Sequence, residues 1–270
     1  MLEIIEFEEV TQIKMSLEVE GRPLYWVAAY LVDGLLIDTG CAHTAEELVA
    51  FLEGVPLDLV VNTHYHEDHV GANGIIARRF GVPILAHPDS VPRINMVPEL
   101  NPYQEYVWGY PEASKVSPLG GTVETASFRF EVVETGGHCP GHVVLFEREK
   151  GWCFSGDIFI TERPKVIRAD EDAAGLIESM GKLAALPSPS ERLVLFTSMG
   201  KIVPDGREAL PACADYFDEL GERVRSLAAE GLSPVEIRER IFGEDSSLAA
   251  LTGGHFSSGN LVASLLAMSK

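Results

Sequence analysis

Hydrophobic and polar positions alternate along the first part of the chain in short runs that are typical of β-strands. Residues 13–20 alternate apolar with polar side chains, and residues 24–32 form a second, more continuous apolar run. Asp33-Gly34 separates that run from residues 35–38, and this dipeptide favours a hairpin turn. The pattern therefore predicts a β-meander that builds one sheet.

The period of the pattern changes after this meander. Thr44 followed by Glu47 predicts a capping box at the start of a helix. Residues 57–61 are typical of a buried strand, residues 72–80 have helical spacing, and residues 84–86 are apolar again. This order predicts a βαβ unit. In open α/β sheets the ligand-binding and catalytic residues usually lie in the loop that leaves the carboxyl end of a strand.

The second half of the chain predicts another sheet and then a helical region. Short strands are expected at residues 127–133, 143–146 and 152–154, and helices at 208–230 and 261–268. Ser233-Pro234-Val235-Glu236 has an N-cap serine, a proline at the first helical position and a glutamate three residues after the cap. We therefore expect an α/β chain with two sheets, in which residues 1–205 form the core and residues 206–270 form a helical extension packed on it.

Residues 88–119 are rich in both proline and aromatic side chains. The prolines argue against a long regular element, while the aromatic side chains need a surface to cover. One interpretation is a loop or lid that shapes an apolar substrate pocket. The other is a surface excursion that packs on its own aromatic residues or on a second subunit. The pattern leaves both open.

Composition narrows the classes of function. Acidic residues outnumber basic ones by 41 to 21, which gives a formal net charge of −20. Such a surface repels phosphate backbones, so we expect no nucleic-acid partner and a small molecule as substrate. The start of the chain has no signal-peptide pattern, and no apolar run is long enough to cross a membrane, so the expectation is a cytoplasmic protein without membrane contact. A homodimer remains an open alternative.

The candidate chemistry is concentrated in residues 63–71, which we call the metal loop. His64 and His66 are two apart, so in an extended backbone they point the same way and can bind one ion. Asp68 and His69 follow after the chain has begun to turn, so we expect them to face another direction and to serve a second ion. Imidazole and carboxylate together suit zinc, iron or manganese better than calcium or magnesium.

The motif His64-x-His66-x-Asp68-His69 resembles the signature of the metallo-β-lactamase superfamily. The segment around His138 is similar to the one that supplies the third histidine of the first metal site, and His142 stands where glyoxalase II-like members often carry a non-ligand histidine. Asp157 resembles the aspartate that bridges the two metals. The resemblance implies a four-layered αββα sandwich of two mixed β-sheets with outer helices.

The resemblance also implies a dinuclear site, with two divalent ions that are zinc in the first instance and iron or manganese as alternatives. Its expected ligands are His64, His66, Asp68, His69, His138 and Asp157. One landmark differs, because Met199 stands where the family usually has a further histidine, and a thioether is a weak ligand here. His255 is the candidate replacement, with a structural histidine as the alternative interpretation.

These residues imply hydrolysis by a metal-activated water, with Asp68 as the catalytic acid and base that orients the water. The expected substrate is an ester, thioester or lactone of a small molecule. The altered landmark at Met199 keeps two alternatives open. One is a mononuclear-iron oxidoreductase of the same fold that resembles persulfide dioxygenases, and the other is a metal-binding protein with impaired catalysis. Asp38 is interpreted as a turn-stabilising residue, with a bracing hydrogen bond to the metal loop as the alternative.

Overall fold

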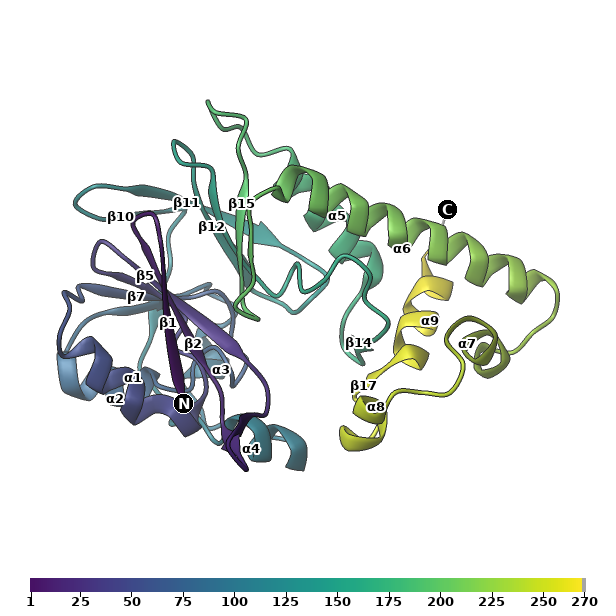
Figure 1. The fold of residues 1–270 in the computed structure, drawn as a ribbon, viewed down its shortest axis with the longest axis horizontal. Coiled ribbons are helices and arrows are strands. Elements are labelled where there is room, and N and C mark those ends of the chain that lie inside the picture. Colours follow the sequence, from purple (N-terminus) through teal and green to yellow (C-terminus); the bar gives the residue numbers. More distant parts are fainter. Residues whose placement is uncertain (269–270) are drawn as a thin grey trace. The chain divides into compact units, whose positions relative to one another are not determined.

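The computed structural model describes residues 1–268 (Figure 1). Contacts divide the described chain into two compact units. The first unit contains residues 1–134, 140–157 and 188–204, and the second contains residues 135–139, 158–187 and the chain from 205 onward. The prediction that the extension from residue 206 packs on the core stays a prediction.

In the described part of the chain, seven strands of the first unit form one mixed sheet in the order β1-β2-β5-β6-β7-β8-β9. The strands are β1 (Leu2–Phe7), β2 (Val10–Met15), β5 (Val27–Val32), β6 (Leu35–Ile37), β7 (Leu59–Asn62), β8 (Ile84–Ala86) and β9 (Ser117–Pro118). The meander β1-β2-β5-β6 is antiparallel, and β6 to β9 are parallel. Asp33 and Gly34 both have positive φ, as the predicted hairpin turn between β5 and β6 requires.

A second sheet of the first unit has, among the described residues, six strands in the order β10-β11-β12-β13-β15-β16. They are β10 (Thr122–Glu124), β11 (Arg129–Thr135), β12 (His142–Glu147), β13 (Trp152–Gly156), β15 (Val194–Thr197) and β16 (Ile202–Val203). Strands β13 and β15 run parallel, so their carboxyl ends lie at the same edge of the sheet. A small ribbon of β3 (Glu18–Val19) and β4 (Arg22–Pro23) completes the strands of this unit.

The two sheets share one hydrophobic core. Tyr30 of β5 lies edge-on to Phe154 of β13 and Phe196 of β15, with ring centroids 5.5 and 5.4 Å apart. Its hydroxyl donates to the carbonyl of Thr197 and accepts from the Gln12 side chain, so this buried polar group is satisfied. The core therefore joins β-strands that are more than a hundred residues apart in sequence.

Short helices follow the parallel strands of the first sheet. They are the 3₁₀ helix η1 (Ala42–Thr44) and the α-helices α1 (Ala45–Leu52), α2 (Asn73–Phe80), α3 (Val91–Ile94) and α4 (Pro102–Trp108). Helix α2 ends at Gly81, whose left-handed φ of 67° closes the helix. The predicted capping box at α1 is wrong. The Thr44 hydroxyl donates back to the carbonyl of Cys41 and caps no helix nitrogen, because η1 occupies the turn before α1.

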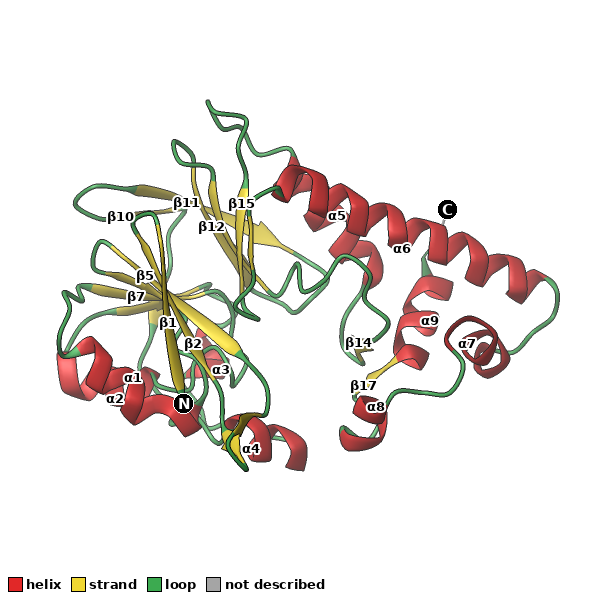
Figure 2. Cartoon of the chain, in the orientation of Figure 1, coloured by secondary structure: helices red, strands yellow, loops and turns green. Residues whose placement is uncertain are grey.

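The second unit is mainly helical (Figure 2). Its elements are β14 (Ile167–Arg168), α5 (Ala173–Ala184), α6 (Gly206–Ala229), α7 (Pro234–Phe242), α8 (Ser247–Leu251), β17 (Phe256–Ser257) and α9 (Ser258–Ala267). The capping box predicted at Ser233 is confirmed at the start of α7. None of the helices within residues 1–268 is long and apolar enough to cross a membrane.

Candidate metal centre

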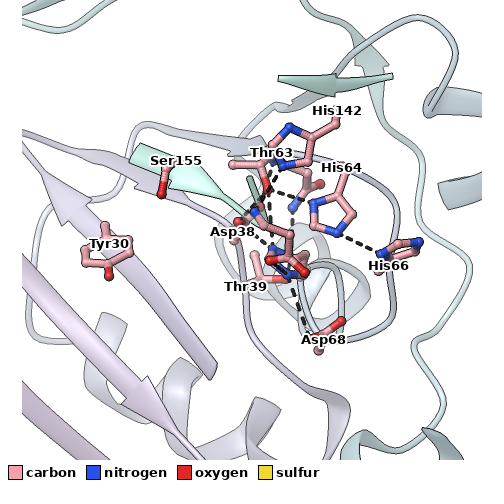
Figure 3. A network of polar contacts seen from close by, with 12 residues as sticks. Tyr30, Asp38, Thr39, Thr63, His64, His66, Asp68, His142 and Ser155 are labelled. Atoms are coloured by element: carbon pink, nitrogen blue, oxygen red, sulfur yellow. Dashed lines mark hydrogen bonds and ion pairs between the residues drawn. The ribbon is translucent and has the colours of Figure 1, made fainter. Parts of the chain in front are cut away.

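The metal loop leaves the carboxyl end of β7, as the strand pattern predicted. His64 and His66 are both buried, and His64 Nε2 lies 2.9 Å from His66 Nδ1 (Figure 3). Their rings stand nearly perpendicular, with centroids 4.5 Å apart. The i, i+2 spacing therefore brings the imidazoles side by side.

The loop then turns back on itself. The backbone N–H groups of His69 and Val70 both donate to the carbonyl of His66. This turn places the ring of His69 against that of His64, with centroids 3.9 Å apart. The sequence predicted that His69 faces away from the first pair, whereas the turn brings it beside His64, with the two rings tilted at 49°.

A carboxylate from the second sheet joins these rings. Asp157 directly follows β13, and its Oδ1 lies 3.2 Å from His69 Nε2. His64, His69 and Asp157 each offer one ligand atom, and these atoms lie within 4.8 Å of one another. Two imidazoles and a carboxylate are a donor set that suits zinc, iron or manganese. Asp68 lies at the edge of this group, with Oδ2 3.8 Å from His69 Nε2.

Asp38 directly follows β6 and holds the metal loop in place through Thr63 and His69 (Figure 3). Its carboxylate accepts from the backbone N–H and the hydroxyl of Thr63, each at 2.8 Å, and contacts His69 Nδ1 at 2.7 Å. Because a carboxylate only accepts, His69 Nδ1 carries the proton in this contact, which leaves Nε2 directed at Asp157. The interpretation of Asp38 as a mere turn residue is wrong, and the bracing alternative is what the structure shows.

The electrostatics around His69 favour a cation. Burial alone would lower the pKa of its imidazole, but the charges of Asp38, Asp157 and Asp68 raise this pKa well above 6.5. Its Nε2 is buried without a hydrogen bond, facing carboxylate oxygens. A positive charge at this position, from a proton or from a metal ion, relieves the repulsion between the carboxylates. The residues present therefore fit a divalent ion.

His142 positions the aspartate. It lies in β12, and its Nε2 accepts from the backbone N–H of Asp157 at 3.1 Å. Gly156 has a φ of 50°, and a Cβ at this position would meet the His142 imidazole and Thr63. A side chain here would therefore displace the imidazole that fixes Asp157. These contacts agree with a non-ligand role for His142.

The metal loop is also attached to the turn after β6. The backbone N–H of Thr39 donates to the carbonyl of His69, and that of Gly71 donates to the carbonyl of Gly40, both at 2.8 Å. A Cβ on Gly71 would collide with the backbone at Cys41 and Ala42, so only glycine permits this approach. The two turns thus form one rigid base beneath the imidazoles.

Met199 lies in the turn after β15. The backbone N–H of the preceding Ser198 donates to the carbonyl of Gly156, next to Asp157. Met199 is half-buried in this turn. No imidazole therefore enters the group around Asp157 from the end of β15.

The remaining predicted ligands, His138 and His255, belong to the second unit. His138 is buried, and its Nδ1 lies 2.6 Å from Glu171 Oε1. The other oxygen of Glu171 accepts from the backbone N–H of Arg168. His255 follows α8, with Nε2 3.8 Å from Asp170. That His138 and His255 join the residues of the first unit at a metal stays a prediction, and nothing in the sequence pointed to Glu171.

The segment 88–119 contains two helices, and both contact the metal loop. From α4, the side-chain amide of Gln104 donates to the buried carboxylate of Glu67 at 2.6 Å. From α3, the guanidinium of Arg93 lies 4.5 Å from the ring centroid of Tyr65. These contacts place the segment against the metal loop, and that it forms a lid that shapes a substrate pocket stays a prediction.

Comparison with known proteins identifies the family to which the chain belongs. Residues 27–190 match the model of the metallo-β-lactamase superfamily. The chain belongs to this superfamily. Its metallo-β-lactamase fold, predicted from the metal loop, is confirmed by a beta-lactamase domain protein from Burkholderia ambifaria, with a TM-score of 0.73 and 19% identity over 97% of this chain and 87% of that one.

Several relatives of this superfamily member carry the names of hydrolases. A probable metallo-hydrolase of Bacillus subtilis, YybB, is 33% identical over 58% of this chain and 71% of that protein. The hydroxyacylglutathione hydrolase GloC of Haemophilus influenzae is 34% identical over 46% of this chain and 59% of the enzyme. Another hydroxyacylglutathione hydrolase, from Aliivibrio salmonicida, is 29% identical over 67% of this chain and 64% of its own length. The matches thus span well under the full length of the hydroxyacylglutathione hydrolases.

Proposed function

We propose that this chain is a metal-dependent hydrolase that cleaves a thioester, ester or lactone of a small molecule. The observation that carries the proposal is the convergence of His64, His69 and Asp157 on one point, with His66 beside them. The likeness to hydroxyacylglutathione hydrolases supports a thioester as the substrate class. Water adds to the acyl carbon and the acyl–sulfur or acyl–oxygen bond breaks. A thioester or ester gives a carboxylic acid and a thiol or alcohol, whereas a lactone opens to a single hydroxy acid.

Bound divalent ions, zinc in the first instance, would supply a water whose pKa falls to about neutrality. The expected ligands are the six residues that the family resemblance implies, together with His255. Among residues of the first unit, Asp38 fixes the tautomer of His69 so that Nε2 faces the donor group, and His142 fixes the backbone of Asp157. A ligand held by such outer hydrogen bonds needs no rearrangement to bind.

Asp68 is the proposed acid and base. It is only partly buried, and it lies beside the rings without being one of the three converging donors. A carboxylate in this position can hold a water by one oxygen and pass its proton to the leaving thiolate or alkoxide. Asp68→Asn would keep the size and the hydrogen-bonding oxygen while removing the basic group.

A second candidate rests on Met199. Without a histidine at the end of β15, the residues around His69 and Asp157 offer fewer ligands to a second metal ion. A single iron bound at the first metal site would then suit oxygen-dependent sulfur chemistry. The distinguishing observation is metal content. We expect about two zinc ions per chain for the hydrolase and about one iron for the oxidoreductase.

The test combines metal analysis with turnover. Protein purified without added metal is analysed for zinc, iron and manganese, and the same sample is assayed on a panel of thioesters and lactones. His64→Ala is expected to lose both metal and activity, while His43→Ala, which alters an exposed histidine outside the group, is expected to keep both. If His255→Ala leaves metal content unchanged, His255 is not the replacement ligand. Full activity of the metal-free protein would contradict the proposal.

A further inference from the structure

Arg93 is a cation placed beside the metal loop. It lies in α3 and is exposed, and its guanidinium makes no hydrogen bond or ion pair with any residue in the described part of the chain. Other exposed arginines of this acidic chain pair with carboxylates, such as Arg79 with Glu53 and Arg129 with Glu124. Arg93 instead rests on an aromatic ring.

The fold fixes the position of this arginine. Helix α3 follows β8, which pairs in parallel with β7, so it starts at the same edge of the sheet as the metal loop. The Ser90 hydroxyl, before α3, donates to the carbonyl of Gly141, and the buried Ile94 anchors the helix from the other side. The guanidinium is therefore carried by an anchored turn.

The ring beneath Arg93 belongs to the metal loop itself. Tyr65 stands between His64 and His66 in sequence, and its ring centroid lies 4.8 Å from that of His66. The guanidinium lies 4.5 Å from the same Tyr65 ring. Tyr65 thus contacts both His66 and Arg93, so the guanidinium lies no farther from the His66 ring than these two distances together, a gap that a small substrate can span.

The contact with Tyr65 leaves the N–H donors of the Arg93 guanidinium available. A cation–π contact uses the flat face of the group, whereas its N–H donors lie in the plane and point outward from the edge. Two of these parallel donors match the oxygens of a carboxylate. The contact with Tyr65 also limits the motion of the side chain, which lowers the entropy lost on binding.

The surroundings of Arg93 are strongly acidic. The site is rich in carboxylates, including Asp38, Asp68 and Asp157, within a chain of net charge −20. An anionic substrate is repelled by such a surface unless a cation receives its charged end. Arg93 is such a cation at the edge of the metal loop.

We propose that Arg93 binds a carboxylate of the substrate, so that the enzyme selects thioesters or esters that carry a free carboxylate several bonds away from the scissile carbonyl. The assignment of the cleaved bond rests on the proposed function, while the carboxylate site rests on Arg93 alone. Arg93 is then a specificity-determining residue that acts on substrate binding.

The test separates binding from cleavage. Two non-cleavable thioether analogues, identical except that one ends in a carboxylate and the other in a carboxamide, are titrated into the metal-loaded protein. We expect the carboxylate to bind about ten-fold tighter or more, as one charge-assisted pair allows. Arg93→Gln is expected to abolish this preference without weakening binding of the carboxamide, and Arg93→Lys to retain part of it.

The matched control is Arg148→Gln, because Arg148 is exposed and follows the end of β12 that is opposite to His142. It should leave the preference unchanged. Equal binding of the two analogues to the wild type, or equal loss of both in Arg93→Gln, would overturn the carboxylate site. The corresponding thioesters are then assayed for turnover. A carboxylate preference in binding without any cleavage would refute the hydrolase and leave the site standing.

Discussion

The contacts of Asp38 determine how much free energy of unfolding is lost when it is replaced. This carboxylate is 4% exposed and accepts from Thr63 N, Thr63 Oγ1 and His69 Nδ1. In Asp38→Asn the remaining oxygen can keep the backbone N–H of Thr63, and the hydroxyl of Thr63 can reverse its role. The N–H of His69 then loses its acceptor. Since a hydrogen bond to a charged group contributes about 1.5–3 kcal/mol and a buried donor left unsatisfied costs a similar amount, we expect a loss of about 2–4 kcal/mol.

The assay is urea unfolding of the metal-free protein in the presence of a chelator, so that lost metal binding does not enter the free energy of unfolding. Asp33→Asn is the matched control. Asp33 has the same left-handed backbone, with a φ of 47° against 60° for Asp38, but it is exposed. Asparagine tolerates this backbone region, so strain contributes little to either variant. A change in Asp38→Asn no larger than that in Asp33→Asn would refute the reasoning.

Three further predictions address other parts of the molecule. Glu171→Gln is expected to weaken metal binding about 10- to 100-fold in a chelator competition, because a neutral amide orients His138 less firmly, while Glu178→Gln on the exposed face of α5 is expected to leave it unchanged. Burial raises the pKa of the Cys153 thiol to about 12, so iodoacetamide at pH 8 should label it only after unfolding, and rapid labelling of the native chain would contradict this. Gly156→Ala is expected to lower both stability and metal content, since its left-handed φ and the imidazole against it leave no room for a methyl group, and wild-type values for both would show that the loop can shift.

Local patterns predicted the strands around the site well. The continuous apolar run at residues 24–32 and the Asp33-Gly34 turn located β5 and β6, and the apolar run before the metal loop located β7. These signals are local, because strand period and turn chemistry act within a few residues. Helix α5 was missed, although Asp172 caps it, because its glycines and small side chains blur the helical stripe.

Long-range contacts were harder to predict. A competing local contact also went unpredicted: the capping box at Thr44 was wrong because the Thr44 hydroxyl donates to the carbonyl of Cys41 in the preceding turn. The role of Asp38 was undervalued because its partners lie 25 and 31 residues away, and no local pattern reports them. The resemblance to a known family supplied Asp157 as a candidate, whereas residue patterns alone gave no reason to place it beside His69.

The backbone bonds that join the metal loop to the turn after β6 bear on the thermodynamics of metal uptake. In small zinc domains, most of the binding free energy is consumed in folding the chain around the ion. Here Thr39, Gly40 and Gly71 hold the loop by bonds that involve no ligand atom, and Asp38 already orients His69. The apoprotein should therefore be fully folded, and ions should exchange without unfolding it. The intrinsic affinity of the imidazoles and carboxylates would then appear almost undiminished in the measured dissociation constant.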